Sequence, residues 1–299
     1  MSHQQPIPAW IEEVRRNRCQ ALRELEKRLC EYQHVEVEEV DLINLGISVV
    51  EMHANAAVDS VPELFFRFPQ NDLPPPDDDK VGEAYPVYTV PTTGLRPKRL
   101  DYIKKMRGYM ASYGEVCFDD FKEKLQASTS KKEVNKWLRG TWGYGEVEDL
   151  EIPYSVVQFE PFFWMVTGTD ELPDQQYPHL VCYMDLDFEG VAKLLREELL
   201  ATVRMMLGRL ESKRGEGHTV APVCLLRIPF FLTMVLHTDV FARGATTRSH
   251  YASGLRRKGP SHLLHKLHDF TTKNYEGLEA FARIDICTVV GNTMTNKRR

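Results

Sequence analysis

The sequence lacks the features of secreted and membrane proteins. Its six cysteines form no CxxC pair, and Cys182 and Cys224 lie within apolar runs, which is typical of buried thiols in a reducing compartment. Residues 1–16 have no apolar core of the length that a signal peptide needs, and the strongest apolar run, VCLLRIPFFLTMVL, is interrupted by Arg227 and Pro229. We therefore expect a cytoplasmic or nuclear protein that is neither secreted nor inserted in a membrane.

Several enzyme motifs are missing as well. The chain has no GxSxG nucleophile motif, no glycine-rich phosphate loop precedes Asp185 and Asp187, and none of its cysteines stands in a recognised catalytic context. The sequence alone therefore does not decide whether the protein is an enzyme.

The composition is that of a globular protein, with 299 residues, 42% of them hydrophobic and 27% charged. The net charge of −5 is unevenly spread. Residues 91–140 carry 12 basic and 6 acidic side chains, and residues 243–273 carry 7 and 1, within a chain that is otherwise acidic. Such basic islands can mark a phosphate-bearing or acidic partner, or they can simply neutralise the acidic segments once the chain folds.

Hydrophobic periodicity divides the chain into four parts. Residues 1–68 form an N-terminal helical segment, 69–98 a proline-rich linker or a loop draped over the surface, 99–140 a small helical unit, and 141–299 an α/β sheet domain. Five segments of the last part are rich in β-branched and aromatic residues and predict strands: 154–168, 179–185, 219–228, 230–237 and 284–290.

Two helices should accompany these strands. One is expected from Phe188 to the SKRGEGH segment, so that it connects two strands, and the other from Pro260. We predict an α+β protein with a helical N-terminal part and a C-terminal mixed β-sheet flanked by helices.

The segment HLVCYMDLDFEGVAKLL carries an acid pair, Asp185 and Asp187, at the end of a predicted strand. Two carboxylates at such a place can bind Mg²⁺ or Mn²⁺, as in DxD transferases. Asp187 also directly precedes the predicted helix, where its carboxylate could accept hydrogen bonds from the first helical turn. Helix capping needs no metal ion, and the sequence favours it.

The segment STSKKEVNKWLRG gives the most geometrically specific signal. Ser130 and Glu133 have the spacing of a capping box, so a helix should begin near Lys131. One face of this helix would carry the side chains that can contact phosphates and base edges, namely Lys132, Asn135, Lys136 and Arg139.

The arrangement of this segment resembles a generic helix-turn-helix, with a short turn after the predicted helix FDDFKEKL. That preceding helix would expose Asp119, Asp120 and Glu123, which would repel a phosphate backbone. A plain packing role for the unit is the alternative.

The segment ARGATTRSHYASGLRRKG could bind an anion through Arg243, Arg248 and Arg256. A flexible basic loop would have the same composition. Both interpretations stay open.

The tail LHDFTTKNYEGLEAFARIDICTVVGNT resembles the ends of uncharacterised intracellular proteins of filamentous fungi. The resemblance covers only the C-terminal quarter. It implies a cytoplasmic or nuclear fungal setting and assigns no functional residue.

Together these patterns favour a non-enzymatic binding or regulatory protein without a cofactor, with nucleic acid as the first partner to test. The alternative is a transferase or hydrolase that uses Asp185 and Asp187 to bind Mg²⁺ or Mn²⁺. The oligomeric state does not follow from the sequence.

Overall fold

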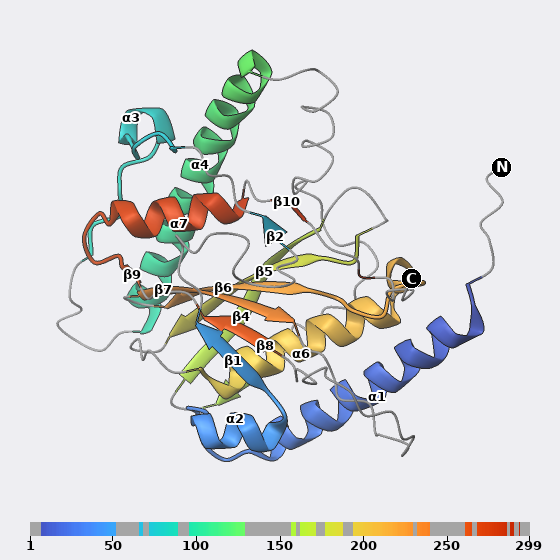
Figure 1. The fold of residues 1–299 in the computed structure, drawn as a ribbon. Helices are drawn as coiled ribbons and strands as arrows, with labels where there is room; N and C mark the ends of the chain where they lie inside the picture. Colours follow the sequence, from blue (N-terminus) through green and yellow to red (C-terminus); the bar gives the residue numbers. More distant parts are fainter. Residues whose placement is uncertain are drawn as a thin grey trace.

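A mixed β-sheet with helices on both faces forms the centre of the molecule (Figure 1). The computed structural model describes residues 7–51, 66–67, 72–88, 96–128, 157–159, 162–171, 177–187, 194–229, 232–239, 261–264, 268–285, 288–289 and 293. The predicted α+β class is confirmed.

The large sheet has eight strands, seven of them in one continuous order. That order is β1 (Ser48–Glu51), β8 (Ser261–Leu264), β7 (Leu232–Asp239), β6 (Val223–Pro229), β5 (Leu180–Asp187), β4 (Phe162–Glu171) and β3 (Val157–Phe159). The short β9 (His268–Asp269) pairs with β7, and β2 (Phe66–Arg67) and β10 (Thr288–Val289) form a separate two-stranded sheet. The pairs β1–β8 and β5–β6 are parallel, and the other pairs are antiparallel.

One face of the sheet is covered by α1 (Ala9–Glu31) and α6 (Arg196–Glu211), which lie side by side (Figure 1). In α1 the buried leucines recur at the three- and four-residue spacing of a helix face. They share one apolar core with α6, with α2 (Glu39–Leu45) and with Leu180, Cys182 and Met184 of β5.

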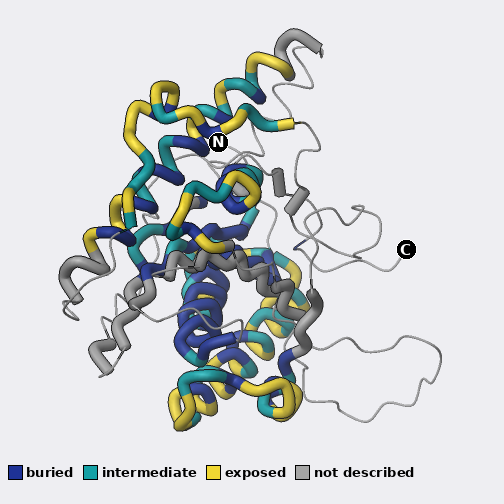
Figure 2. The backbone as a smooth tube through the Cα atoms, turned by 90° about the vertical axis from the view of Figure 1, so that its left-hand side faces the viewer, coloured by how far each residue is buried: buried dark blue, intermediate teal, exposed yellow. Residues whose placement is uncertain are grey.

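The opposite face is covered by the long helix α4 (Arg96–Ser128) and by α7 (Tyr275–Asp285), with α3 (Asp78–Val81) against α4. A second core lies here and includes Val181 of β5, because successive side chains of a strand point to opposite faces. Figure 2 shows the buried residues concentrated in the interior and the exposed ones along the outer sides of the helices.

Residues 72–88 are held against this second layer by tyrosines. The hydroxyl of Tyr85 donates to the carbonyl of Phe270 at 2.7 Å, and that of Tyr113 of α4 donates to the carbonyl of Pro74 at 2.7 Å. This part of the proline-rich segment is therefore an ordered surface layer. The N-terminal part also contributes β1 to the edge of the large sheet, so its residues and those of the C-terminal part share one sheet.

The predicted connection between two strands is present as β5–α6–β6, with β5 and β6 parallel. The start of the helix was predicted wrongly, however, because α6 begins at Arg196 and not at Phe188. Residues 194–196 instead pair with the chain near Glu36, through the hydrogen bonds Val37 N–Leu194 O at 2.9 Å and Arg196 N–Val35 O at 2.8 Å. This long-range pairing holds them extended, and Glu198 accepts the Leu195 N–H at 2.7 Å as the cap.

Two further expectations are corrected. Residues 261–264, expected in a helix from Pro260, form β8 between β1 and β7, because strand partners far away in the sequence override the local helical pattern. The segment FDDFKEKL, expected as a helix of its own within the small helical unit, belongs to the single long helix α4.

None of the described helices is both long and apolar enough to cross a membrane. Of the described cysteines, four are buried and Cys30 is exposed, and all of them are free thiols.

Candidate functional site

Asp185 is a buried acid near the C-terminal end of β5, on the face of the sheet that α4 covers. Its neighbours Met184 and Cys182 belong to the core on the other face, whereas Val181 belongs to the α4 side. The alternation of the strand therefore directs the Asp185 side chain toward α4, where only 2% of it is exposed.

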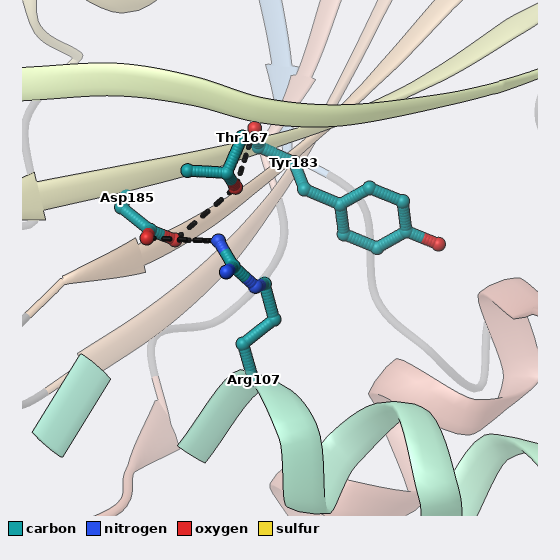
Figure 3. Close-up of polar contacts among 4 residues, drawn as sticks. All are labelled: Arg107, Thr167, Tyr183 and Asp185. Atoms are coloured by element: carbon teal, nitrogen blue, oxygen red, sulfur yellow. Dashed lines mark hydrogen bonds and ion pairs between the residues drawn. The ribbon is translucent and has the colours of Figure 1, made fainter. Parts of the chain in front are cut away.

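The partner of Asp185 is Arg107 of α4 (Figure 3). Arg107 Nη1 donates to Oδ1 at 3.0 Å and to Oδ2 at 2.8 Å. Thr167 of β4 lies 3.4 Å from Oδ1, at an irregularity between Val166 and Gly168 that shifts the register of β4 against β5. One helix and two strands thus meet at this carboxylate.

Burial raises the pKa of Asp185, because the loss of water disfavours its charged form more than Arg107, Thr167 and Lys104 favour it. The charged carboxylate therefore depends on its cation. A partly buried arginine 2.8–3.0 Å away supplies that cation, with 30% of its side chain exposed.

The same geometry bears on the metal-binding alternative. A divalent ion at Asp185 would have to displace Arg107 from a carboxylate that is almost fully buried. In the part of the chain that the structure describes, no three His, Cys, Asp or Glu side chains come together in a way that could hold a metal ion. Asp187 is the last residue of β5, eight residues before the cap residue Leu195, so it does not cap α6; its side chain lies outside the description.

The N-terminal part of α4 is strongly basic around this ion pair. From Arg96 to Arg107 the helix carries six Lys or Arg residues and one acid, Asp101. Lys104 and Lys105 are exposed, and Lys105 Nζ lies 2.8 Å from Asp101. Lys104 and Arg107 are three residues apart and therefore share a side of the helix.

This charge distribution opposes the helix dipole. The N-terminus of a helix favours acids, and each cation in the first turn costs a few tenths of a kcal/mol up to about 1 kcal/mol. Nevertheless the first turn of α4 has no acid, whereas Asp119, Asp120 and Glu123 lie toward the C-terminal end. Helix stability thus gives no reason for the basic N-terminal part.

An acidic segment limits the surface that an anion could reach. Asp78 accepts a hydrogen bond from Tyr109 of α4 at 2.7 Å, and a Cβ atom at Gly108 would lie 3.6 Å from Glu83 Oε2. Asp77, Asp79 and Glu83 are exposed. Gly108 lies four residues after Lys104 and next to Arg107, so the carboxylate of Glu83 lies close to these cations, and a polyanion would have to approach α4 beside it.

A second ionic cluster lies near the start of β5, at the other end of the strand. The carboxylate of Glu171, on β4, contacts the guanidinium groups of Arg209 and Arg214. Next to it, His218 Nδ1 lies 2.8 Å from the Thr293 hydroxyl, and both residues are buried. Burial, with a smaller contribution from the charge of Arg209, lowers the pKa of His218 to about 4.

The other predicted site residues lie outside the described part of the chain. These are Lys132, Asn135, Lys136 and Arg139 of the predicted basic helix, and Arg243, Arg248 and Arg256 of the predicted anion-binding loop. Their roles stay predictions. Arg107 was not singled out from the sequence, and the only signal for it was that an acid within an apolar strand needs a cation nearby.

Comparison of the chain with protein-family models, with curated proteins and with solved structures finds no match.

Proposed function

We propose that the protein is a non-enzymatic nucleic-acid-binding protein and that the N-terminal part of α4 is its contact surface. The observation that carries the proposal is the exposed basic part of α4, where Lys104 and Lys105 are exposed and Arg107 shares the side of Lys104. Side chains of this kind bind phosphates of a nucleic-acid backbone and release condensed counterions, which supplies affinity independent of sequence.

The dimensions of the basic part fit a polyanion. From Arg96 to Arg107 the helix advances about 16 Å at 1.5 Å per residue. One strand of a duplex carries a phosphate every 3.4 Å along the axis, so about five phosphates span this length. A single small anion would need only one or two of the six cations.

The basic residues beyond α4 extend the proposal. Lys132, Lys136 and Arg139 would add phosphate contacts, and Asn135 could contact a base edge. Arg243, Arg248 and Arg256 could bind further phosphates. A protein with this role would act in the nucleus or the cytoplasm.

The test is a titration of the protein with a labelled mixed-sequence DNA duplex at several salt concentrations. Each phosphate that the protein neutralises adds about 0.9 to the slope of log affinity against log salt. We expect the variant Lys104→Ala/Lys105→Ala to reduce the slope by about 2 and to bind more weakly at every salt concentration. Circular dichroism should show an unchanged fold, because both side chains are exposed.

The matched control is Lys122→Ala/Lys124→Ala, which removes the same charge from the acidic end of the same helix. Its slope should equal that of the natural protein. If the natural protein did not bind the duplex at low salt, or if the two double variants reduced the slope by the same amount, α4 would not be the contact surface.

A further inference from the structure

The hydrogen bonds of Arg107 leave part of its guanidinium group available. Both bonds to Asp185 come from Nη1 (Figure 3). Nε and Nη2 donate to no acceptor among the residues that the structure describes, and 30% of the side chain is exposed. Arginine presents its donors as a planar fork, so the same group can bind a carboxylate at one nitrogen and a phosphate at the other two.

We propose that Asp185 is a positioning residue for nucleic-acid binding, which holds Arg107 so that Nε and Nη2 donate to a backbone phosphate. This inference rests on the proposed function, since it assigns one phosphate contact within the same surface. Asp185 itself is too deeply buried to touch the nucleic acid.

Burial is what makes Asp185 an effective anchor. If Arg107 swung out to reach a phosphate, a carboxylate with 2% exposure would lose its cation. Arg107 therefore stays in place and the phosphate comes to it. A side chain that is already ordered loses less conformational entropy on binding, which raises affinity.

The neighbouring groups support the binding of a phosphate at Arg107. Lys104 lies three residues before Arg107 on the same side of α4, and its charge acts on Asp185. Thr167 holds the carboxylate from the opposite side, 3.4 Å from Oδ1. A phosphate bound by Arg107 would thus lie next to a second exposed cation.

Removing the charge of Asp185 tests the proposal, because the two explanations predict opposite changes in affinity for the duplex. Asp185→Asn removes a negative charge beside the contact surface, so simple electrostatics predicts tighter binding of a polyanion. Positioning predicts the reverse, because a neutral amide holds the guanidinium less strongly than a carboxylate does. We expect Asp185→Asn to weaken binding of the duplex by about tenfold, the effect of losing one charge-assisted hydrogen bond.

The experiment compares Asp185→Asn, Arg107→Ala and the double variant with the full-length natural protein, in the same salt titration. If Asp185 acts only through Arg107, the two single variants should lose similar affinity and the double variant should lose no more than Arg107→Ala. Arg107→Lys provides a second test in case Asp185→Asn fails to fold. The lysine ammonium can pair with Asp185 but has no further nitrogen atoms that could donate to a phosphate. The slope of log affinity against log salt should therefore fall by about 1 although the charge is unchanged.

The outcomes separate this inference from the proposed function. Equal or tighter binding by a folded Asp185→Asn, or an unchanged slope for Arg107→Lys, would overturn the positioning role, while Lys104→Ala/Lys105→Ala would still reduce the slope. If the natural protein did not bind the duplex at all, both would fail together.

Discussion

Replacing Glu171 with alanine is expected to lower the free energy of unfolding by about 3–5 kcal/mol, the usual cost of removing one partner from a buried ion pair. The Glu171 carboxylate contacts Arg209 and Arg214, and the side chains of Glu171 and Arg209 are 7% and 1% exposed. Without it, two guanidinium groups lose their shared carboxylate inside the protein. Urea denaturation followed by circular dichroism measures the change.

A surface pair provides the control. Arg23 and Glu211 also form a close ion pair, but their side chains are 54% and 41% exposed. Arg23→Ala should therefore cost at most about 1 kcal/mol. If both variants lost the same small free energy, water would have access to the Glu171 cluster and the buried description of it would be wrong.

The stability of the protein is expected to fall as the pH is lowered from about 6.5 to about 4, in part because of His218. Its pKa falls from 6.5 to about 4 in the folded state, so the unfolded chain takes up a proton in this range before the folded protein does. At 1.36 kcal/mol per unit, the shift corresponds to a loss of about 3 kcal/mol. Denaturation at a series of pH values measures it.

The contribution of His218 is isolated by His218→Gln, which keeps a polar group near the Thr293 hydroxyl but does not titrate. The stability advantage of the natural protein over this variant should shrink by about 3 kcal/mol between pH 7 and pH 4. The raised pKa of Asp185 acts with the opposite sign, since that group stabilises the fold as the pH falls, but it is present in both proteins and cancels. If the difference in the free energy of unfolding between the two proteins did not change with pH, His218 would not be kept neutral by burial.

Local patterns were enough to predict the elements whose stability comes from their own periodicity. Helix α1 follows from the spacing of Leu22, Leu25 and Leu29, and β5 from its run of apolar and aromatic residues. The parallel β5–α6–β6 unit also follows from this order of elements.

Elements that depend on distant partners were not predictable in this way. β8 is a strand because β1, more than 200 residues earlier in the chain, pairs with it. Likewise, α6 starts late because residues 194–196 pair with the chain near Glu36. Such pairings leave no local pattern, and the helix expected from Pro260 was therefore wrong.

The candidate site could likewise be predicted from the sequence only in part. The sequence indicated that Asp185 was unusual, because an acid follows an apolar strand, but it did not indicate which of 38 basic residues would pair with it. The answer depends on how α4 crosses β5, and that is fixed by packing in the core around Tyr109 and Val181. The basic island at residues 91–140 was visible in the sequence, whereas the position of Lys104 beside a buried ion pair was not.

Amine-reactive labelling of lysines, with and without a DNA duplex and with mass-spectrometric detection, tests most directly whether α4 is the binding surface. We expect the duplex to protect Lys104 and Lys105 from modification. Lys27 of α1, whose side chain is 76% exposed, and Lys124 at the acidic end of α4 should react at the same rate in both conditions. Equal modification of Lys104 and Lys105 with and without bound duplex would contradict the proposed surface.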